Sequence, residues 1–329
     1  TDVEAEAVVR EYVRTINANP LTLNFTAYVA PSDNVNSGSD DGILEFEGIP
    51  IEFFLPEDQR ALSGIAFGGS ARADYRLSRD DVQTTRVGAF AAGETYALSS
   101  EARDLLESSP NEDVQDVTGR DFATLQLEAV LTHQRLDVLP FGGTLFSLTY
   151  GTYWQGEERL VNYRDTAFAQ DFRTDVGTVN VRLSHRDQTA LLDTLVDQDT
   201  YDAITTFVTN RANNDQIRYT LAYRYSDAGF ENIYDEFRMG LGYRFAEPIW
   251  GTRLSTSLQI GTRNYDEFAT TLDGRDDRFA SLSVDAIFTD ISYFGFSPSV
   301  SLSTSRTVST AEEETSSVAQ ILFGIESNF

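Results

Sequence analysis

Two histidines are the side chains best suited to acid–base chemistry, and their spacing argues against that role. Each one continues a run of apolar residues at every second position, namely Leu127, Ala129 and Leu131 before His133, and Val179, Val181 and Leu183 before His185. Side chains two apart on a strand share a face. Both imidazoles therefore belong to an apolar face, whereas a general base must reach a polar site with its reaction partner beside it.

Other catalytic and binding motifs are missing from the sequence. It contains no G-x-S-x-G motif, no phosphate-binding loop and no dinucleotide-binding glycine pattern. With no cysteine, it has no thiolate metal site, and its histidines lack metal-ligand spacing. We therefore predict neither an enzyme nor a bound cofactor or metal, the alternative being a barrel enzyme that uses one of the histidines.

Seven arginines fall at the polar positions of segments in which polar and apolar residues alternate. They are Arg182, Arg218, Arg224, Arg238, Arg244, Arg253 and Arg263. In a membrane-spanning barrel such positions face the lumen. We expect these side chains to line it, as ladders that face Asp and Glu, the alternative being a path for a substrate.

The formal net charge of -27 excludes nucleic acid as a partner, because binding it requires clustered Lys and Arg. Acidic residues gather in three places expected to be loops: 101–121, 266–277 and 312–314. None has the spacing of an EF-hand. The loops are either simply solvated or bridged by divalent cations to the lipopolysaccharide of an outer membrane.

The element that must position these residues is the amphipathic strand. Apolar residues occupy every second position in segments such as 21–29, 217–225, 237–244 and 282–288. About fourteen such segments follow one another, each near the roughly 9–11 residues that cross a tilted barrel wall. They lie near 20–31, 63–76, 81–98, 121–135, 142–156, 164–174, 176–188, 200–211, 214–226, 231–245, 250–264, 277–289, 295–308 and 316–329.

The pattern predicts an all-β fold, a transmembrane antiparallel β-barrel of about fourteen strands over 20–329. Links between strands alternate between short and long, as periplasmic turns and outer loops do. An even strand count puts both termini on one side, which we expect to be the periplasmic side of a bacterial outer membrane. The helical spacing of apolar residues in 3–17 predicts a short helix, so we expect 1–19 to be a separate periplasmic segment.

One of the longer links, residues 39–60, is unusually apolar. We predict that it folds inward as a plug or lid, because so many apolar side chains are unsuited to open exposure. The candidates are Ile43, Phe46, Ile49, Phe53 and Phe54.

The last strand resembles the signal that barrel assembly machinery recognises. Ile321, Phe323 and Ile325 alternate up to the C-terminal Phe329, although Ser327 stands where an apolar residue is usual. Membrane lipids, lipopolysaccharide and that machinery are the partners we expect.

Longer stretches resemble one family of barrels. GTRNYDEF (261–268), DGRDDRFASLSVDAIFTDISYFGFSPSVSLSTSRTVS (273–309), APSDNVN (30–36) and SGIAFGGSARADYRLS (63–78) are similar to the C-terminal barrel of surface lipoprotein assembly modulators. In that family a periplasmic tetratricopeptide-repeat domain precedes a fourteen-stranded barrel, and 1–19 would be its remnant. The resemblance implies assistance in translocating or displaying lipoproteins, with a surface lipoprotein as client. A porin-like channel for small solutes is the alternative that the barrel alone supports.

Overall fold

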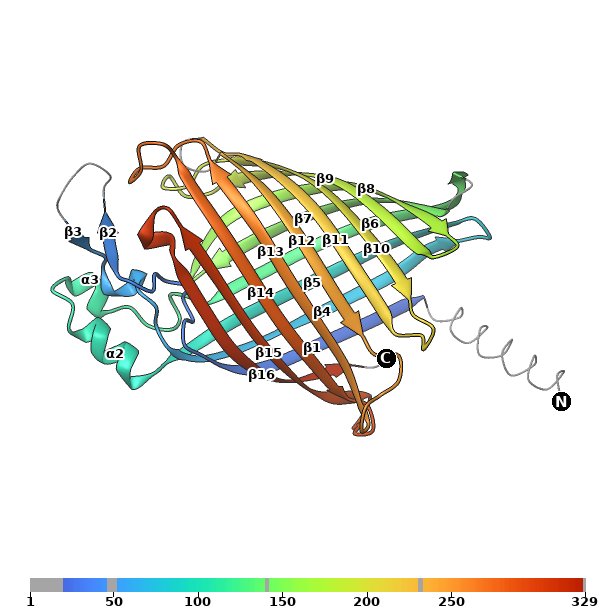
Figure 1. Cartoon of the computed structure of the whole chain (residues 1–329), viewed down its shortest axis with the longest axis horizontal. Coiled ribbons are helices and arrows are strands. Elements are labelled where there is room, and N and C mark those ends of the chain that lie inside the picture. Colours follow the sequence, from blue (N-terminus) through green and yellow to red (C-terminus); the bar gives the residue numbers. More distant parts are fainter. Residues whose placement is uncertain (1–19, 46–51, 140–141, 230–232, 328–329) are drawn as a thin grey trace.

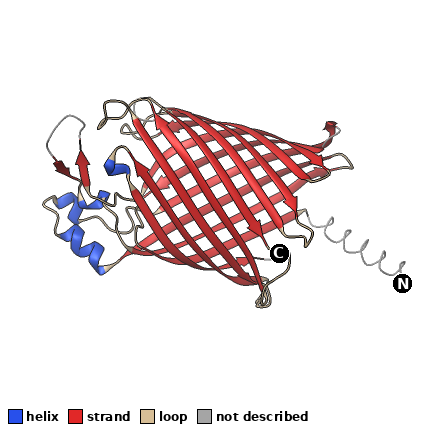
Figure 2. Ribbon diagram, viewed as in Figure 1, coloured by secondary structure: helices blue, strands red, loops and turns tan. Residues whose placement is uncertain are grey.

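Fourteen long strands close on themselves to form the wall of a barrel (Figures 1 and 2). The computed structural model describes residues 20–45, 52–139, 142–229 and 233–327. Every strand is antiparallel to the next one along the chain, and the first, β1, pairs with the last, β16. The wall strands are β1 (Leu21–Ser32), β4 (Gly64–Arg79), β5 (Gln83–Leu98), β6 (Thr124–Leu139), β7 (Gly142–Gln155), β8 (Glu158–Thr174), β9 (Gly177–Ala190), β10 (Gln198–Asn210), β11 (Gln216–Asp227), β12 (Tyr234–Arg244), β13 (Thr252–Tyr265), β14 (Arg275–Phe288), β15 (Phe296–Ser309) and β16 (Ser316–Ser327).

The two faces of this wall have opposite character, as the alternation predicts. Apolar side chains on the outer face stay about half exposed in the isolated chain, for example Leu221 at 50%, Phe237 at 43% and Phe323 at 55%. So large an apolar belt needs an apolar surrounding. The fold is therefore the predicted barrel with an apolar outer face. Among the described residues, no helix combines the length and apolarity needed to cross a membrane.

Two connections differ from the prediction. Residues 158–163, expected to lie in a longer link, are part of β8, and a two-residue turn at Gly156 and Glu157 joins it to β7. Gly156 has a φ of +61°, which glycine adopts without strain. Residues 99–120, expected to be only a loop, contain α2 (Ser100–Glu107) and α3 (Glu112–Gln115). Ser99 caps α2 by accepting the Ala102 N–H at 3.0 Å.

The largest apolar core lies outside the barrel wall, at the mouth where the longer connections meet (Figure 1). Leu62, from the link between β1 and β4, is fully buried against Leu106 of α2, which is 1% exposed. Val35, Ala102 and Val114 complete this core. Two connections far apart in the sequence therefore pack into one cap beside the lumen.

The apolar segment predicted to be a plug stands beyond the same mouth. Its described part is a hairpin of β2 (Ile43–Glu45) and β3 (Glu52–Phe54), which projects away from the barrel (Figure 1). Phe53 and Phe54 are 44% and 79% exposed. Phe46 and Ile49 lie outside the described residues, as does the helix predicted within 1–19. An inward plug is not what the described residues form, and a lid remains a prediction.

The seam that closes the barrel has a short backbone ladder. β1 and β16 pair from Thr26 and Glu326 to Ser32 and Gln320, whereas β1 and β4 pair along the whole length of β1. Side chains complete the seam at both ends. At one end the Phe25 N–H donates to Ser327 Oγ at 2.8 Å.

At the other end, two carboxylates from the link after β1 accept the N–H groups of β16. The Ala319 N–H donates to Asp33 at 2.8 Å and the Ser317 N–H donates to Asp40 at 3.1 Å. Ser327, the residue that departs from the expected assembly signal, thus belongs to the closure, and so do two loop carboxylates.

The two faces can be told apart chemically. We expect Cys replacements at Leu221 and Phe237 to react with a lipid-phase probe, and replacements at Arg218 and Arg224 to react with a water-soluble one, because residues of opposite parity lie on opposite faces. Labelling of the barrel reconstituted in vesicles measures this. The register would be wrong if the arginine positions reacted from lipid and Leu221 did not.

Candidate functional site: the polar lumen

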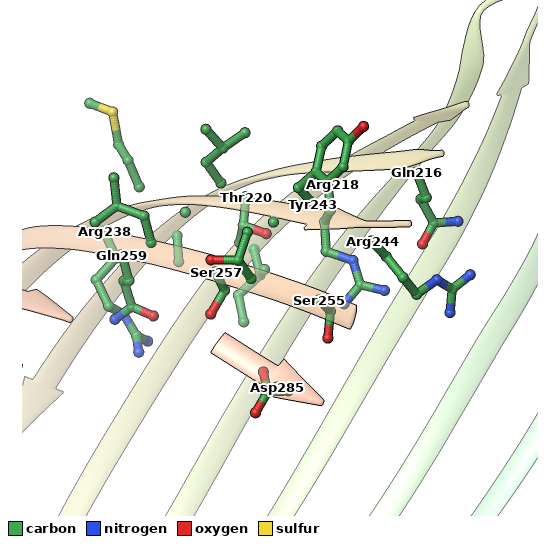
Figure 3. Close-up of a pocket in the computed structure, with 18 residues that line it drawn as sticks. Gln216, Arg218, Thr220, Arg238, Tyr243, Arg244, Ser255, Ser257, Gln259 and Asp285 are labelled. Atoms are coloured by element: carbon green, nitrogen blue, oxygen red, sulfur yellow. The ribbon is translucent and has the colours of Figure 1, made fainter. Parts of the chain in front are cut away.

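All seven predicted arginines fall on the inner face by the pairing register. Figure 3 shows Arg218, Arg238 and Arg244 on one side of the wall and Tyr243 on the other. Arg182 lies 3.6 Å from Asp165 of β8. The inner face is thus lined with guanidinium groups, many of them beside carboxylates.

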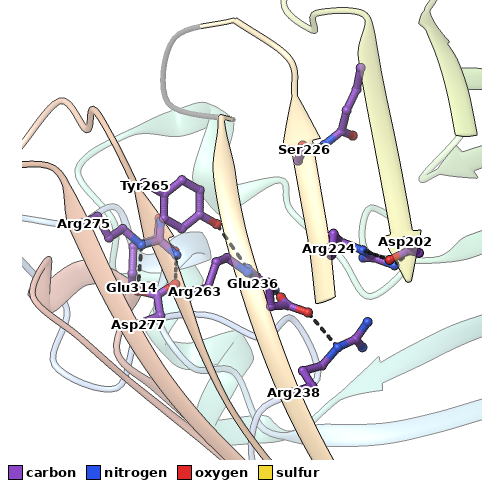
Figure 4. A network of polar contacts seen from close by, with 11 residues as sticks. Asp202, Arg224, Ser226, Glu236, Arg238, Arg263, Tyr265, Arg275, Asp277 and Glu314 are labelled. Atoms are coloured by element: carbon purple, nitrogen blue, oxygen red, sulfur yellow. Dashed lines mark hydrogen bonds and ion pairs between the residues drawn. The ribbon is translucent and has the colours of Figure 1, made fainter. Parts of the chain in front are cut away.

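Glu236 joins two of these arginines. Its side chain is 2% exposed, and its two oxygens lie 2.8 Å from Arg238 Nε and 2.6 Å from Arg263 Nη2 (Figure 4). Arg263 is its cross-strand partner on β13, and it also donates to the Tyr265 hydroxyl at 3.1 Å. A buried carboxylate bound on both oxygens is satisfied only while both guanidinium groups remain.

A second cluster ties the wall to the link between β15 and β16. Arg275 donates two hydrogen bonds, of 2.9 and 2.7 Å, to the carboxylate of Asp277. It also forms an ion pair at 3.0 Å with Glu314 of the short helix η2 (Glu312–Glu314) (Figure 4). Burial raises the pKa of Glu314 above its ordinary value, and the nearby Arg275 opposes this shift. On the same face, Arg224 donates to Asp202 at 2.8 Å.

Glycines on the inner face differ in what an added side chain would meet. A side chain on Gly68, Gly151 or Gly261 would collide with an aromatic ring, since its Cβ would lie 2.2–2.4 Å from Tyr28, Tyr163 or Phe279. Rings that lie over strand glycines in this way pin the register of a sheet. Gly240 and Gly242 of β12 carry no such ring: a Cβ there would find its nearest neighbours at 3.4 and 3.6 Å.

A cavity of about 400 Å³ opens over these two uncovered glycines (Figure 3). Its walls come from β11 and β13, and Arg238 and Arg244 flank the glycines along β12 itself. The lining residues with polar side chains are Gln216, Arg218, Thr220, Arg238, Tyr243, Arg244, Ser255, Thr256, Ser257, Gln259 and Asp285.

Both histidines lie away from the lumen. Their register partners place them on the outer face, where His133 Nδ1 and Thr85 Oγ1 are 2.9 Å apart and His185 Nε2 lies 2.6 Å from Asp199. The residues of the assembly signal also point outward: Ile321, Phe323 and Ile325 are 42–55% exposed, and Phe329 lies outside the described residues.

Sequence reasoning named the arginines but not their partners. Glu236 lies two residues before Arg238 and therefore on the same face of β12. Asp202 of β10 and Asp277 of β14 likewise occupy inward positions of their strands. The alternation of polar and apolar residues therefore indicated that these carboxylates face inward. It did not indicate which residue of the next strand each carboxylate would face.

No protein-family model matches the chain, and no curated protein sequence matches it. Solved outer-membrane proteins are similar to it in fold. OccAB4 of Acinetobacter baumannii has 9% identity and a TM-score of 0.44, covering 94% of this chain and 98% of that chain. The outer membrane protein opdK of Pseudomonas aeruginosa has 8% identity and a TM-score of 0.45, covering 93% and 98%. A BenF-like porin of Pseudomonas fluorescens Pf-5 has 8% identity and a TM-score of 0.46, covering 94% and 99%.

The buried carboxylate at the centre of the first cluster can be tested directly. Glu236→Ala should lower the free energy of unfolding by about 3 kcal/mol, because it leaves two inner arginines without their shared partner. Glu236→Gln, which keeps the shape, should cost less. Urea titration of the barrel in lipid vesicles, followed by the mobility difference between folded and unfolded protein in gels, measures both. A Glu236→Ala variant as stable as the wild type would contradict the assignment.

Proposed function

We propose that this chain is a channel of a bacterial outer membrane that passes small polar solutes. The observation that carries the proposal is the closed wall with an apolar outer face and an inner face that carries most of the wall's polar side chains. Spanning barrels of antiparallel strands are the architecture of that membrane, and a polar interior is how they admit water and solutes. Both the strand parity and the arginine-rich lumen support this function.

The mouths of the barrel differ, which bears on how solutes enter. The mouth with the longer connections carries the cap of residues 33–45, 52–63 and 99–123. Residues 99–123 hold seven carboxylates, Glu101, Asp104, Glu107, Glu112, Asp113, Asp116 and Asp121, against two arginines, Arg103 and Arg120. We propose that this mouth faces the cell exterior and that the β2–β3 hairpin serves as a lid over it. The termini would then be periplasmic.

Channel activity is measured in a planar bilayer. We expect the purified barrel to give stepwise conductance in potassium chloride. Ser303→Trp should lower the step, because Ser303 belongs to the serine-rich inner face of β15, whereas Leu302→Trp on the outer face should leave it unchanged. A folded, inserted barrel without conductance, or equal effects of the two substitutions, would contradict a channel through the lumen.

A second function, assistance in displaying lipoproteins, has one observation in its favour: the seam between β1 and β16. Acyl chains prefer hydrocarbon by about 0.8 kcal/mol per buried CH₂, so moving them through an arginine-lined lumen would be costly. A path along the seam avoids that cost, and the backbone ladder there covers only Thr26–Ser32 on β1. Gly324, in the middle of the ladder, adds no side-chain packing.

The seam proposal is tested by locking it. Val29 and Phe323 are register partners across the seam, and Val29 and Phe67 are register partners across the β1–β4 ladder. Cells that carry the gene with Val29→Cys and Phe323→Cys should lose surface display of lipoprotein clients and regain it on reduction. The matched pair Val29→Cys and Phe67→Cys should have no effect. Display by the locked barrel at wild-type levels would exclude lateral release.

A further inference from the structure

We infer that the cavity over Gly240 and Gly242 is a binding site for an oxyanion, the carboxylate or phosphate group of a small solute. The inference rests on the proposed channel function and deepens it, because it names the class of solute that the lumen would select. It depends on three features of the cavity: its floor, its charge and its place along the barrel.

The floor is open although the backbone does not require glycine there. Neither Gly240 nor Gly242 has a positive φ, and a Cβ at either position would make ordinary or only slightly tight contacts, with Thr220 Cβ at 3.4 Å and Arg218 Cβ at 3.6 Å. Glycine within a strand costs stability. At Gly68, Gly151 and Gly261 of the inner face an aromatic ring fills the gap above the glycine. Here the gap is left as a hollow between β11 and β13.

The charge of the hollow is positive. Its lining includes three arginines, Arg218, Arg238 and Arg244, and one carboxylate, Asp285. Across the described residues, Arg218 and Arg244 have no carboxylate within ion-pair distance. Asp285 accepts hydrogen bonds from Ser301 of the neighbouring strand β15 at 2.6 Å and from Ser283 of its own strand at 3.3 Å.

Two guanidinium groups without a carboxylate partner therefore line one hollow from the same side of the wall (Figure 3). Each guanidinium presents donors in a planar fork that matches the two oxygens of a carboxylate or phosphate. Gln216, Ser255 and Ser257 add neutral donors along the same wall. A cavity of about 400 Å³ is in the size range of small-molecule sites.

The place of the hollow fits an anion despite the chain's net charge of -27. Arg244 is the last residue of β12, and the short link to β13 follows it. The site therefore lies toward the short-turn mouth, at the opposite end from the carboxylate-rich cap of residues 99–123. The carboxylates of that cap lie at the far end of the barrel, where salt screens their repulsion of a bound anion. That repulsion is small beside the attraction of the two nearby guanidinium groups.

Equilibrium binding tests the site without requiring conductance. The purified barrel in detergent is titrated calorimetrically with sodium succinate and with inorganic phosphate, and choline chloride serves as a cationic probe. We expect one or both anions to bind and choline not to bind. Arg218→Gln and Arg244→Gln should each weaken anion binding about ten-fold or more, the size of a lost charge-assisted pair, and Gly242→Leu, which fills the hollow, should do the same.

Two control variants separate the site from the general field of the lumen. Arg86→Gln removes an inner-face arginine of β5, on the opposite wall of the barrel, and Arg306→Gln removes an arginine of the outer face of β15. Both should bind anions within about two-fold of the wild type. Gel mobility of unheated samples verifies that each variant is folded, and the two arginine variants keep the test decisive if Gly242→Leu does not fold.

The outcomes distinguish this inference from the channel proposal. If the wild type binds neither anion, or if Arg86→Gln weakens binding as much as Arg218→Gln does, the site is refuted, whatever the conductance. If anions bind as expected and the barrel does not conduct, the site stands and the channel proposal fails.

Discussion

Backbone hydrogen bonding in a medium without water is the constraint on which the rest of this structure depends. Hydrocarbon offers no partner for an N–H or C=O group, so a sheet that spans a membrane must close and leave no edge. Closure here joins β1 to β16, which are about three hundred residues apart in the sequence. Where the backbone ladder stops, Asp33, Asp40 and Ser327 supply the missing partners through their side chains.

Closure also decides what the lumen contains. Once the register is set, every second side chain points inward, so the inner face must carry groups that tolerate water. The chain uses arginine for all of its 25 basic residues and has no lysine. A guanidinium can bridge a carboxylate and an aromatic ring at once, as Arg275 does with Asp277 and Tyr265, whose ring centre is 4.5 Å away. Rings lie over Gly68, Gly151 and Gly261, whereas Gly240 and Gly242 leave a hollow.

The sequence predicts the strands and their faces well, because the alternation of polar and apolar residues is a local pattern. Leu221 faces outward and Arg218 inward, as expected. The prediction fails where the local structure, a turn or a short helix, depends on only a few residues. The link expected to extend to residue 163 is a turn of only Gly156 and Glu157, and α2 is a single amphipathic stretch within a polar loop.

Long-range pairing is the other limit of sequence reasoning. The partners of Arg263 or Arg275 depend on how far each strand is staggered against the next, which the period of two leaves open because any even shift preserves the faces. The hollow at Gly240 and Gly242 is hidden for the same reason: it exists only because Arg218, Thr220, Ser255 and Ser257 of two other strands come to lie beside those glycines.

Hydrogen exchange at the seam is the most direct measurement of whether the barrel is closed. The barrel would be placed in lipid nanodiscs, and exchange followed for the backbone amides of Ala27–Val29 and Phe323–Ile325, with Leu258 and Leu282 of the β13–β14 ladder as the interior reference. A closed seam predicts exchange at the seam about as slow as at the reference amides. Seam amides that exchange as fast as those of an exposed loop, while the reference stays protected, would show an open edge and contradict the account.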